Sequence, residues 1–174
     1  MLRRRLLCLC LLLLTQCKDP PPAPPQNPVS LLPPETQTGQ RTFGCIVNGQ
    51  VWTPAGSPLG GSLFKTQYFN QQLTVSANRA VTVNGISTDQ SIALNVKTTA
   101  PGVYALTQPS GDFANLIDLV TNCTYYTRST AAGTLEITQL DLVNRIVSGR
   151  FSFTLETPGC GQVVVTDGRF DSRF

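Results

Sequence analysis

The chain contains no histidine, and this absence narrows the chemistry that the protein can perform. Serine–histidine hydrolysis, cysteine–histidine proteolysis and histidine-ligated metal sites are all excluded. Charged residues make up only 13% of the sequence, and no apolar run approaches the roughly 18 residues that a transmembrane helix needs. The formal net charge of +3 resides in Arg3, Arg4 and Arg5, so the remainder of the chain is neutral. We therefore expect no nucleic-acid partner, because such binding requires a clustered basic face.

The first 17 residues have the layout of an export signal. Three arginines precede an apolar run of nine residues, 6–14, which is the secretory pattern and is too short to cross a bilayer core of about 30 Å. The sequence Leu-Thr-Gln-Cys at 14–17 then resembles the lipobox of bacterial lipoproteins, although Gln16 stands where a small residue is usual. The resemblance implies cleavage before Cys17 and acylation of its thiol. The alternative is a soluble secreted protein with an ordinary cleavage site.

Lys18 and Asp19 follow the lipidation cysteine. A lysine and acidic residues at this place resemble the surface-export signal of Bacteroidota lipoproteins, and here one acid is present. Two or more acyl chains anchor a protein stably to its membrane. We therefore expect an outer-membrane lipoprotein displayed at the cell surface, with a periplasm-facing lipoprotein as the alternative.

Proline is concentrated near the amino terminus, since eight of the 13 prolines lie in residues 18–42. Proline-rich segments adopt extended polyproline II structure, and this one predicts a disordered tether reaching up to roughly 75 Å. The sequence thus divides into a signal peptide at 1–16, the lipidated Cys17 and tether at 17–42, and one domain at 43–174.

The domain has an all-β composition. Short runs rich in Val, Ile, Thr, Tyr and Phe alternate with Gly, Asn, Asp and Pro, which predicts a single antiparallel β-sandwich or barrel of about nine to ten strands. Residues 113–120 fit either a short helix or a strand, and turns are expected at 84–85 and 158–159. The strands are expected at 45–52, 62–69, 71–77, 91–97, 102–107, 123–128, 134–139, 145–156 and 162–174.

The last expected strand contains a change of register. Val163 and Val165 share one face, whereas Phe170 has the opposite parity. One extra residue at Asp167-Gly168 would return all of them to one face, so we predict a β-bulge there, with Gly168 supplying the unusual backbone angle. A tight Asp-Gly hairpin turn is the alternative.

Three cysteines remain for the domain, because two others lie in the signal and Cys17 takes lipid. In an oxidising compartment disulfides persist. We expect a Cys123–Cys160 bridge, since both residues lie in the second half beside the strongest strand patterns. Cys45 is then a buried thiol, or the alternative partner.

Three segments carry a family resemblance: TFGCIVNGQVWTP at 42–54, GTLEITQLDLVNRIVSGRFSFTL at 133–155 and VVVTDGRFDSRF at 163–174. They resemble an uncharacterised lipoprotein family of the Bacteroidota, with a GC-x-VNG-x-W opening and an SG-x-F-x-F…GRFD ending. The resemblance covers residues 43–174 and implies the localisation and the fold. It carries no established activity and no catalytic residues, and we expect neither a cofactor nor a metal.

Acidic side chains offer one candidate chemistry, because paired carboxylates perform glycoside hydrolysis. Asp141 and Asp167 lie at turn or bulge signals, where aspartate forms local hydrogen bonds. Asp171 alternates outward beside arginines at 169 and 173, which suits a surface pair, and Glu136 and Glu156 also alternate outward. A calcium site at 110–112 or 141–144 has no supporting spacing.

Aromatic side chains offer a second candidate. Trp52, Tyr125 and Tyr126 are predicted to line a ligand surface, with core packing as the alternative. Tyr125 and Tyr126 are adjacent, so one of them faces outward in a strand. We expect a non-enzymatic module that is attached to the membrane through its lipid and binds a protein or glycan. A carboxylate-based glycan-acting enzyme and a structural subunit of an envelope assembly are the alternatives.

Overall fold

The protein is described from a computed structural model covering residues 27–58, 61–107, 111–127 and 133–174. The export signal, Cys17, Lys18 and Asp19 lie outside these residues. Within the described part of the chain, no helix is long and apolar enough to cross a membrane.

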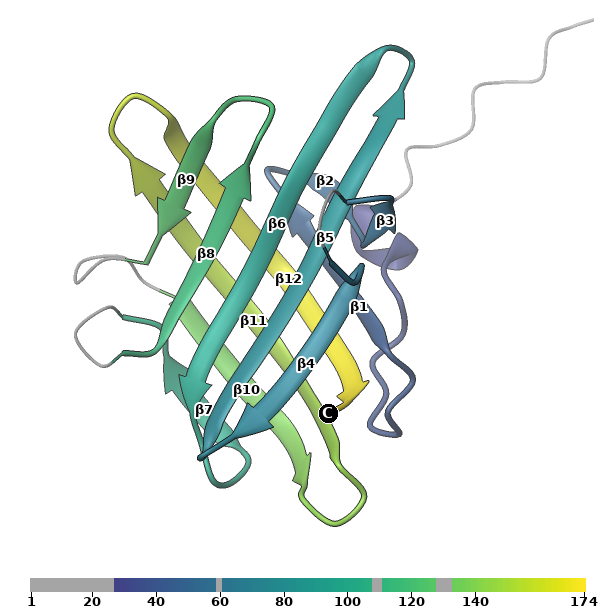
Figure 1. The fold of residues 1–174 in the computed structure, drawn as a ribbon, viewed down its shortest axis with the longest axis vertical. Helices are drawn as coiled ribbons and strands as arrows, with labels where there is room; N and C mark the ends of the chain where they lie inside the picture. The colour runs from purple at the N-terminus through teal and green to yellow at the C-terminus, as the bar shows by residue number, and fades with distance from the viewer. Residues whose placement is uncertain (1–26, 59–60, 108–110, 128–132) are drawn as a thin grey trace, which may run out of the picture.

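Two β-sheets pack face to face as a sandwich, and their strands run across one another in projection (Figure 1). Among the described residues, every pairing between strands is antiparallel except that of β3 with β5, which is parallel. Sheet A has the order β2-β1-β12-β11-β10-β7 and contains β1 (Thr42–Val47), β2 (Gln50–Trp52), β7 (Gly102–Ala105), β10 (Gly133–Asp141), β11 (Ile146–Thr157) and β12 (Gly161–Arg173). Sheet B has the order β3-β5-β6-β8-β9, with β4 also on β5, and contains β3 (Ala55–Gly56), β4 (Phe64–Phe69), β5 (Gln72–Val83), β6 (Ile86–Lys97), β8 (Phe113–Asp118) and β9 (Cys123–Tyr126).

The predicted all-β sandwich is confirmed, with twelve strands in the described residues where nine to ten were expected. One added strand comes from Asn48-Gly49, where both residues have positive φ and fold 45–52 into the hairpin of β1 and β2. Asn-Gly is the strongest short-range hairpin signal, because its backbone matches the twist of the flanking strands. The ambiguous segment at 113–120 forms strand β8.

The expected turn at Asn84-Gly85 is present and joins the long strands β5 and β6. These strands pair from Gln72–Lys97 to Val83–Ile86, so they extend further toward the turn than the predicted 71–77 and 91–97. The added residues are mostly polar and partly exposed, which is why their apolar pattern was weak.

The core consists of the inward-facing apolar side chains of both sheets. Phe43 of β1 is part of this core, and its ring centroid lies 5.2–5.8 Å from those of Trp52, Phe64 and Phe151. The largest side chains that are fully buried are Leu73, Val75, Ile92, Leu94, Val96, Leu106, Leu116, Leu135, Ile137, Val147, Leu155 and Val165.

The predicted β-bulge is confirmed on β12. Phe151 pairs with Gly168 and Phe153 pairs with Val165, so two residues of β12 oppose one residue of β11. The origin of the unusual angle was predicted wrongly, because Asp167 has the positive φ of 53° rather than Gly168. Gly168 is required for space instead, since a Cβ there would lie 2.4 Å from Cε2 of Phe151.

A disulfide joins Cys123 to Cys160, the expected pair. It connects β9, at the edge of sheet B, to the turn between β11 and β12 of sheet A. Cys45 is a fully buried free thiol, and burial raises its pKa far above the ordinary value. The bridge therefore links the two layers, and the remaining thiol is a small core residue.

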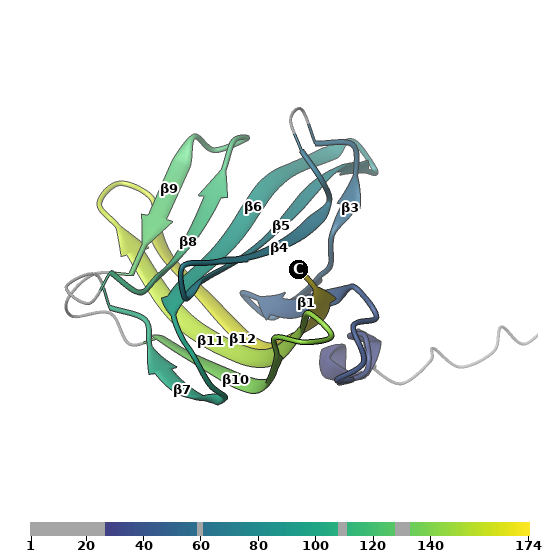
Figure 2. The ribbon, with the colours of Figure 1, turned by 60° about the horizontal axis from the view of Figure 1, so that its bottom comes forward.

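Residues 27–41, which we name the strap, lie against strands β1, β2 and β12 of sheet A. The strap begins with the short 3₁₀ helix η1 (Pro28–Leu31), which lies beside β1 (Figure 2). Leu32 is buried, and Pro33 packs so closely on Gly44 that a Cβ there would lie 2.7 Å from Cδ of the proline. The prediction of a free tether up to residue 42 is therefore wrong for 27–41, while residues 18–26 lie outside the described ones.

Candidate functional site

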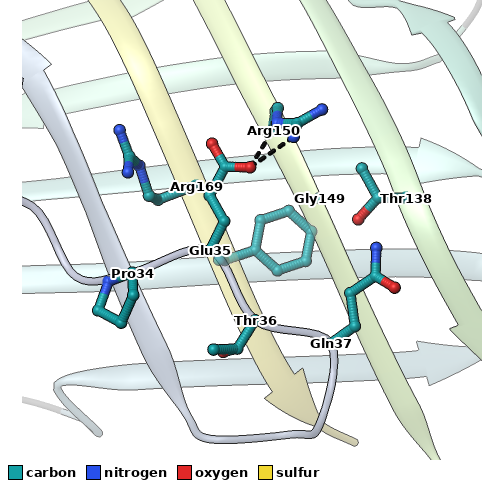
Figure 3. Close-up of a pocket in the computed structure, with 9 residues that line it drawn as sticks. Pro34, Glu35, Thr36, Gln37, Thr138, Gly149, Arg150 and Arg169 are labelled. Carbon is teal, nitrogen blue, oxygen red and sulfur yellow. Dashed lines mark hydrogen bonds and ion pairs between the residues drawn. The ribbon is translucent and has the colours of Figure 1, made fainter.

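A polar groove lies on the outer face of sheet A, between the strap and strands β10, β11 and β12 (Figure 3). It has two hollows, of about 380 Å³ and about 300 Å³, which share Glu35, Arg150 and Arg169. The first hollow is also lined by Pro34, Thr36, Gln37, Thr138, Gly149 and Phe170. The second is also lined by Thr134, Glu136, Phe151, Ser152, Asp167 and Gly168.

Strand register places three charged residues in a row across the groove. Glu136 pairs with Arg150, and Arg150 pairs with Arg169 on the next strand. Directly opposed residues have Cβ atoms about 4.5–5.5 Å apart, and like charges at that spacing repel. The two arginines therefore need a negative charge between them, or a ligand that supplies one.

Glu35 of the strap supplies that charge (Figure 3). Its Oε2 accepts hydrogen bonds from Nε and Nη2 of Arg150, at 2.8 and 2.5 Å, and Glu136 Oε2 lies 3.4 Å from Nη1. The side chains of Arg150 and Glu35 are 53% and 42% exposed, so water reaches the pair. Such surface ion pairs contribute at most about 1 kcal/mol to stability.

The pKa of Glu35 lies below the ordinary value of a glutamate. The hydrogen bond from Arg150 lowers the pKa most, partial burial opposes it, and the positive charges of Arg150 and Arg169 lower it further. Glu35 is therefore a carboxylate at neutral pH and acts here as an acceptor.

Arg169 is less fully engaged than Arg150. Its Nε donates to the carbonyl of Asp167 at 3.4 Å and its Nη1 to the carbonyl of Pro33 at 3.5 Å, both longer than the usual 2.9–3.0 Å. It forms no ion pair within 4 Å with any residue that the structure describes. The guanidinium retains donors that a molecule in the groove can use.

Asp171 holds the strap at the end of the groove. It is 1% exposed, and its carboxylate accepts five hydrogen bonds at 2.7–3.1 Å. The donors are Thr36 Oγ1, the backbone N–H groups of Thr38, Gly39 and Gln40, and Ser148 Oγ.

The predicted surface pairing of Asp171 with Arg169 and Arg173 is wrong, because the strap covers this outward-facing residue. Burial alone would raise the pKa of Asp171, but hydrogen bonds from Gln40, Thr36, Ser148 and Gly39 lower it below the ordinary value. The carboxylate is thus occupied by four donors of the strap and by Ser148.

Residues 58–172 match the family described as a domain of unknown function, DUF6252. The chain belongs to this family. No curated protein and no solved structure matches the chain. The region matched to DUF6252 contains Arg150, Arg169 and Asp171, whereas Glu35 and the rest of the strap precede it.

In this DUF6252 protein the three aromatic residues predicted to line a ligand surface do not lie together. Trp52 and Tyr125 are 3% and 9% exposed and belong to the core, so the prediction is wrong for both. Their polar atoms are satisfied inside, since Trp52 Nε1 donates to Gln90 Oε1 and the Tyr125 hydroxyl donates to the carbonyl of Cys160. Tyr126, at 43% exposed, is the outward member of its pair.

The other acidic candidates divide between turns and the groove. Asp141 accepts hydrogen bonds from the backbone of Val143 and from Asn144, which is the turn role expected of it. Glu136 joins the groove, and Glu156 is exposed. Asp112 accepts from the backbone N–H of Lys97, and the described residues hold no cluster of three or more potential metal ligands from Cys, Asp and Glu.

The groove is not evident from the sequence, because Glu35 lies in a proline-rich segment that predicts a tether and Arg150 and Arg169 lie in separate expected strands. A usable signal was present: antiparallel pairing of the expected strands 145–156 and 162–174 around the turn at 158–159, with the predicted bulge, opposes Arg150 and Arg169. Two opposed arginines indicate a nearby counter-charge or an anionic ligand.

A third hollow, separate from the groove, is mostly apolar and lies beside η1, with a volume of about 510 Å³. Leu31 and Leu63 border it and are partly exposed. It lacks the convergent charged groups that orient a ligand, so the polar groove is the stronger candidate.

Proposed function

We propose that this protein is a lipid-anchored envelope lipoprotein of the Bacteroidota that binds a ligand or a partner without transforming it. The layout of residues 1–17, with Cys17 directly after the apolar run, supports the anchor. Lys18 and Asp19 support display at the surface of the outer membrane, with a periplasm-facing location as the alternative.

The groove carries the binding function. Its hollows of about 380 and 300 Å³ are near the lower end of the size range of small-molecule sites, roughly 300–1,000 Å³. Several side chains in it present hydroxyl, amide or guanidinium groups, and these suit a polar molecule such as a saccharide or an acidic peptide segment. The ligand is thus proposed to lie between the strap and strands β10, β11 and β12.

Binding is favoured over glycan hydrolysis by the electrostatics of the two glutamates. A glycosidase needs one carboxyl group with a raised pKa to act as general acid. Glu35 and Glu136 instead share contact with Arg150, and the pKa of Glu35 is lowered. This pair is better suited to orienting Arg150 than to donating a proton.

Metabolic labelling with palmitate tests the anchor. We expect the wild-type chain to incorporate label and Cys17→Ala to lose it, while Cys45→Ala, which alters a buried thiol, keeps it. Equal labelling of the wild type and Cys17→Ala would exclude lipidation at this residue. Protease treatment of whole cells, comparing the wild type with Lys18→Ala and Asp19→Ala, then distinguishes surface display from the periplasmic alternative.

A glycan and peptide array probed with the full-length protein in neutral detergent tests the binding function. We expect ligands whose signal falls at least tenfold in Arg150→Gln/Arg169→Gln and is unchanged in Lys65→Gln, which removes an exposed cation on sheet B. The proposal fails if binding survives the double substitution, or if the bound molecule is cleaved. Recovery of a stable protein complex instead of array ligands would favour the structural-subunit alternative.

A further inference from the structure

We propose that the ligand of the groove carries an oxyanion group, which displaces Glu35 from Arg150 and bridges Arg150 and Arg169. The inference rests on the proposed binding function and names the chemical class of its ligand. Carboxylate, sulfate and phosphate groups share the required chemistry, because each presents at least two acceptor oxygens to a guanidinium.

The register of sheet A brings the two arginines together. Arg150 and Arg169 are directly opposed on neighbouring antiparallel strands and line both hollows. Their shared position brings two positive charges together, and the carboxylates of Glu35 and Glu136 contact Arg150 there. An oxyanion between them is attracted by both charges and relieves their mutual repulsion.

Glu35 already occupies part of this position as an internal carboxylate. Its Oε2 accepts two hydrogen bonds from Arg150, and Arg169 contributes to holding Glu35 ionised. Glu35 belongs to the strap rather than to the sheet, and its side chain is 42% exposed. A carboxylate from solution can therefore replace it at a small cost, since such a pair is weak.

Arg169 is only weakly hydrogen-bonded, because its two hydrogen bonds to carbonyl groups are 3.4 and 3.5 Å long. Charge-assisted bonds to an oxyanion are shorter, about 2.7–2.9 Å, and roughly twice as strong as neutral ones. Arg169 would therefore form stronger hydrogen bonds with an external oxyanion than with its present carbonyl partners.

The strap can release Glu35 without leaving the sheet. Asp171 holds residues 36–40 by its hydrogen bonds to the backbone and to Thr36, and these bonds do not involve Glu35. Leu32 remains buried on the other side of the glutamate. Displacement therefore requires only rotation of the Glu35 side chain and leaves the groove intact.

The test uses the full-length protein in neutral detergent, labelled with ¹⁵N-arginine, with the Nε–H resonances of Arg150 and Arg169 as the readout. The probes are galacturonate and galactose, which differ by one carboxylate, together with inorganic sulfate and phosphate. We expect galacturonate to shift both resonances saturably and galactose to leave them unchanged. Saturable shifts with sulfate or phosphate also support the oxyanion class, and their relative affinities identify the preferred source.

Three variants test the displacement of Glu35. Glu35→Gln removes the internal competitor, and we expect galacturonate to bind roughly twofold to fivefold tighter, the equivalent of a surface ion pair. Arg169→Gln is expected to weaken binding at least tenfold, and Lys65→Gln to leave it unchanged. Unaltered affinity in Glu35→Gln overturns the displacement.

The remaining outcomes separate this inference from the proposed function. Equal shifts with galactose and galacturonate overturn the oxyanion requirement but leave a binding groove in place. An array ligand that needs the groove arginines and has no oxyanion does the same. If no probe shifts the resonances and no array ligand depends on the groove, both proposals fall.

Discussion

On sheet B, the outward-facing side chains of the central strands bond to one another across the strands. Gln72 donates to Asn95, and Asn95 donates to Thr74 Oγ1, while all three remain partly exposed. On sheet A, the outward-facing Ser148 and Asp171 are almost completely buried. In both sheets, side chains that point inward alternate with side chains that point outward, but the strap covers only the outer face of sheet A. An outward position in a strand therefore does not determine whether a side chain contacts water.

Polar side chains on the covered outer face of sheet A need hydrogen-bond partners within the protein, whereas those on the open outer face of sheet B can bond to water. A buried carboxylate without partners is costly, because it loses its hydration. Asp171 compensates with five hydrogen bonds, four of them from the strap. A charged residue on the covered face has thus become the attachment point of another segment.

The largest expected effect comes from Asp171→Asn. Oδ2 accepts from the backbone N–H groups of Thr38 and Gln40, and an amide NH₂ at that place would face donors instead. We expect a loss of about 3 kcal/mol in the free energy of unfolding, measured by urea denaturation. The control is Asp89→Asn on the outer face of sheet B, where the change should stay within about 0.5 kcal/mol. Equal losses in the two variants would contradict the distinction between the faces.

Gly168→Ala tests the bulge that sets the register of Asp171. A Cβ at Gly168 would lie 2.4 Å from Cε2 of Phe151, so the ring must shift. We expect a loss of roughly 2 kcal/mol in the free energy of unfolding. Gly102→Ala, also in sheet A, is the matched control, because its nearest neighbouring atom is 3.7 Å from the added Cβ. A neutral Gly168→Ala would show that the bulge accommodates a side chain.

Acid should weaken the attachment of the strap. The pKa of Asp171 in the folded protein lies below its value in the unfolded chain, which is roughly 3.9. Its ionised form therefore stabilises the fold fully above about pH 4, and this contribution is lost as the pH falls through the folded pKa. We expect the stability difference between the wild type and Asp171→Asn to narrow between pH 5 and pH 2. A constant difference over that range would mean that the carboxylate charge is unimportant.

The smallest expected effect is that of Glu35→Gln on stability. The pair with Arg150 is exposed, so we expect a change below about 1 kcal/mol, with Lys65→Gln near zero as the control on sheet B. Thermal unfolding in low and high salt measures it, and salt should reduce the difference further. A change as large as that of Asp171→Asn would make the ion pair, rather than Asp171, the main attachment of the strap.

Local pattern predicted much of the sheet structure. In the strand expected at 145–156, Val147, Phe151 and Leu155 have the same parity and are all buried, and the parity change in the last strand located the bulge. The source of the positive φ was misassigned, because the collision between Gly168 and Phe151 depends on a neighbouring strand. The hairpin at Asn48-Gly49 was predictable from its two residues and was overlooked within a longer apolar run.

The groove was harder to predict because it depends on contacts distant in sequence. Glu35 and Arg150 are 115 positions apart, and a proline-rich composition favours an extended tether over a packed segment. The burial of Trp52 and Tyr125 likewise depends on which face of each strand meets the other sheet. Neither the contact of Glu35 with Arg150 nor the burial of these two aromatic side chains can be deduced from the composition or spacing of the residues.

Strand β1 has a practical consequence for work on the domain. It lies between β2 and β12 and pairs with β12 from Thr42–Asp171 to Val47–Val165, yet it precedes the family match that begins at residue 58. A recombinant fragment limited to the matched residues would lack β1. Strand β12 would then be an exposed edge strand with unpaired backbone groups, and Phe170 would lose its neighbour Phe43. Such edges recruit other chains. Fragments beginning at residue 27 should stay monodisperse where those beginning at 58 self-associate.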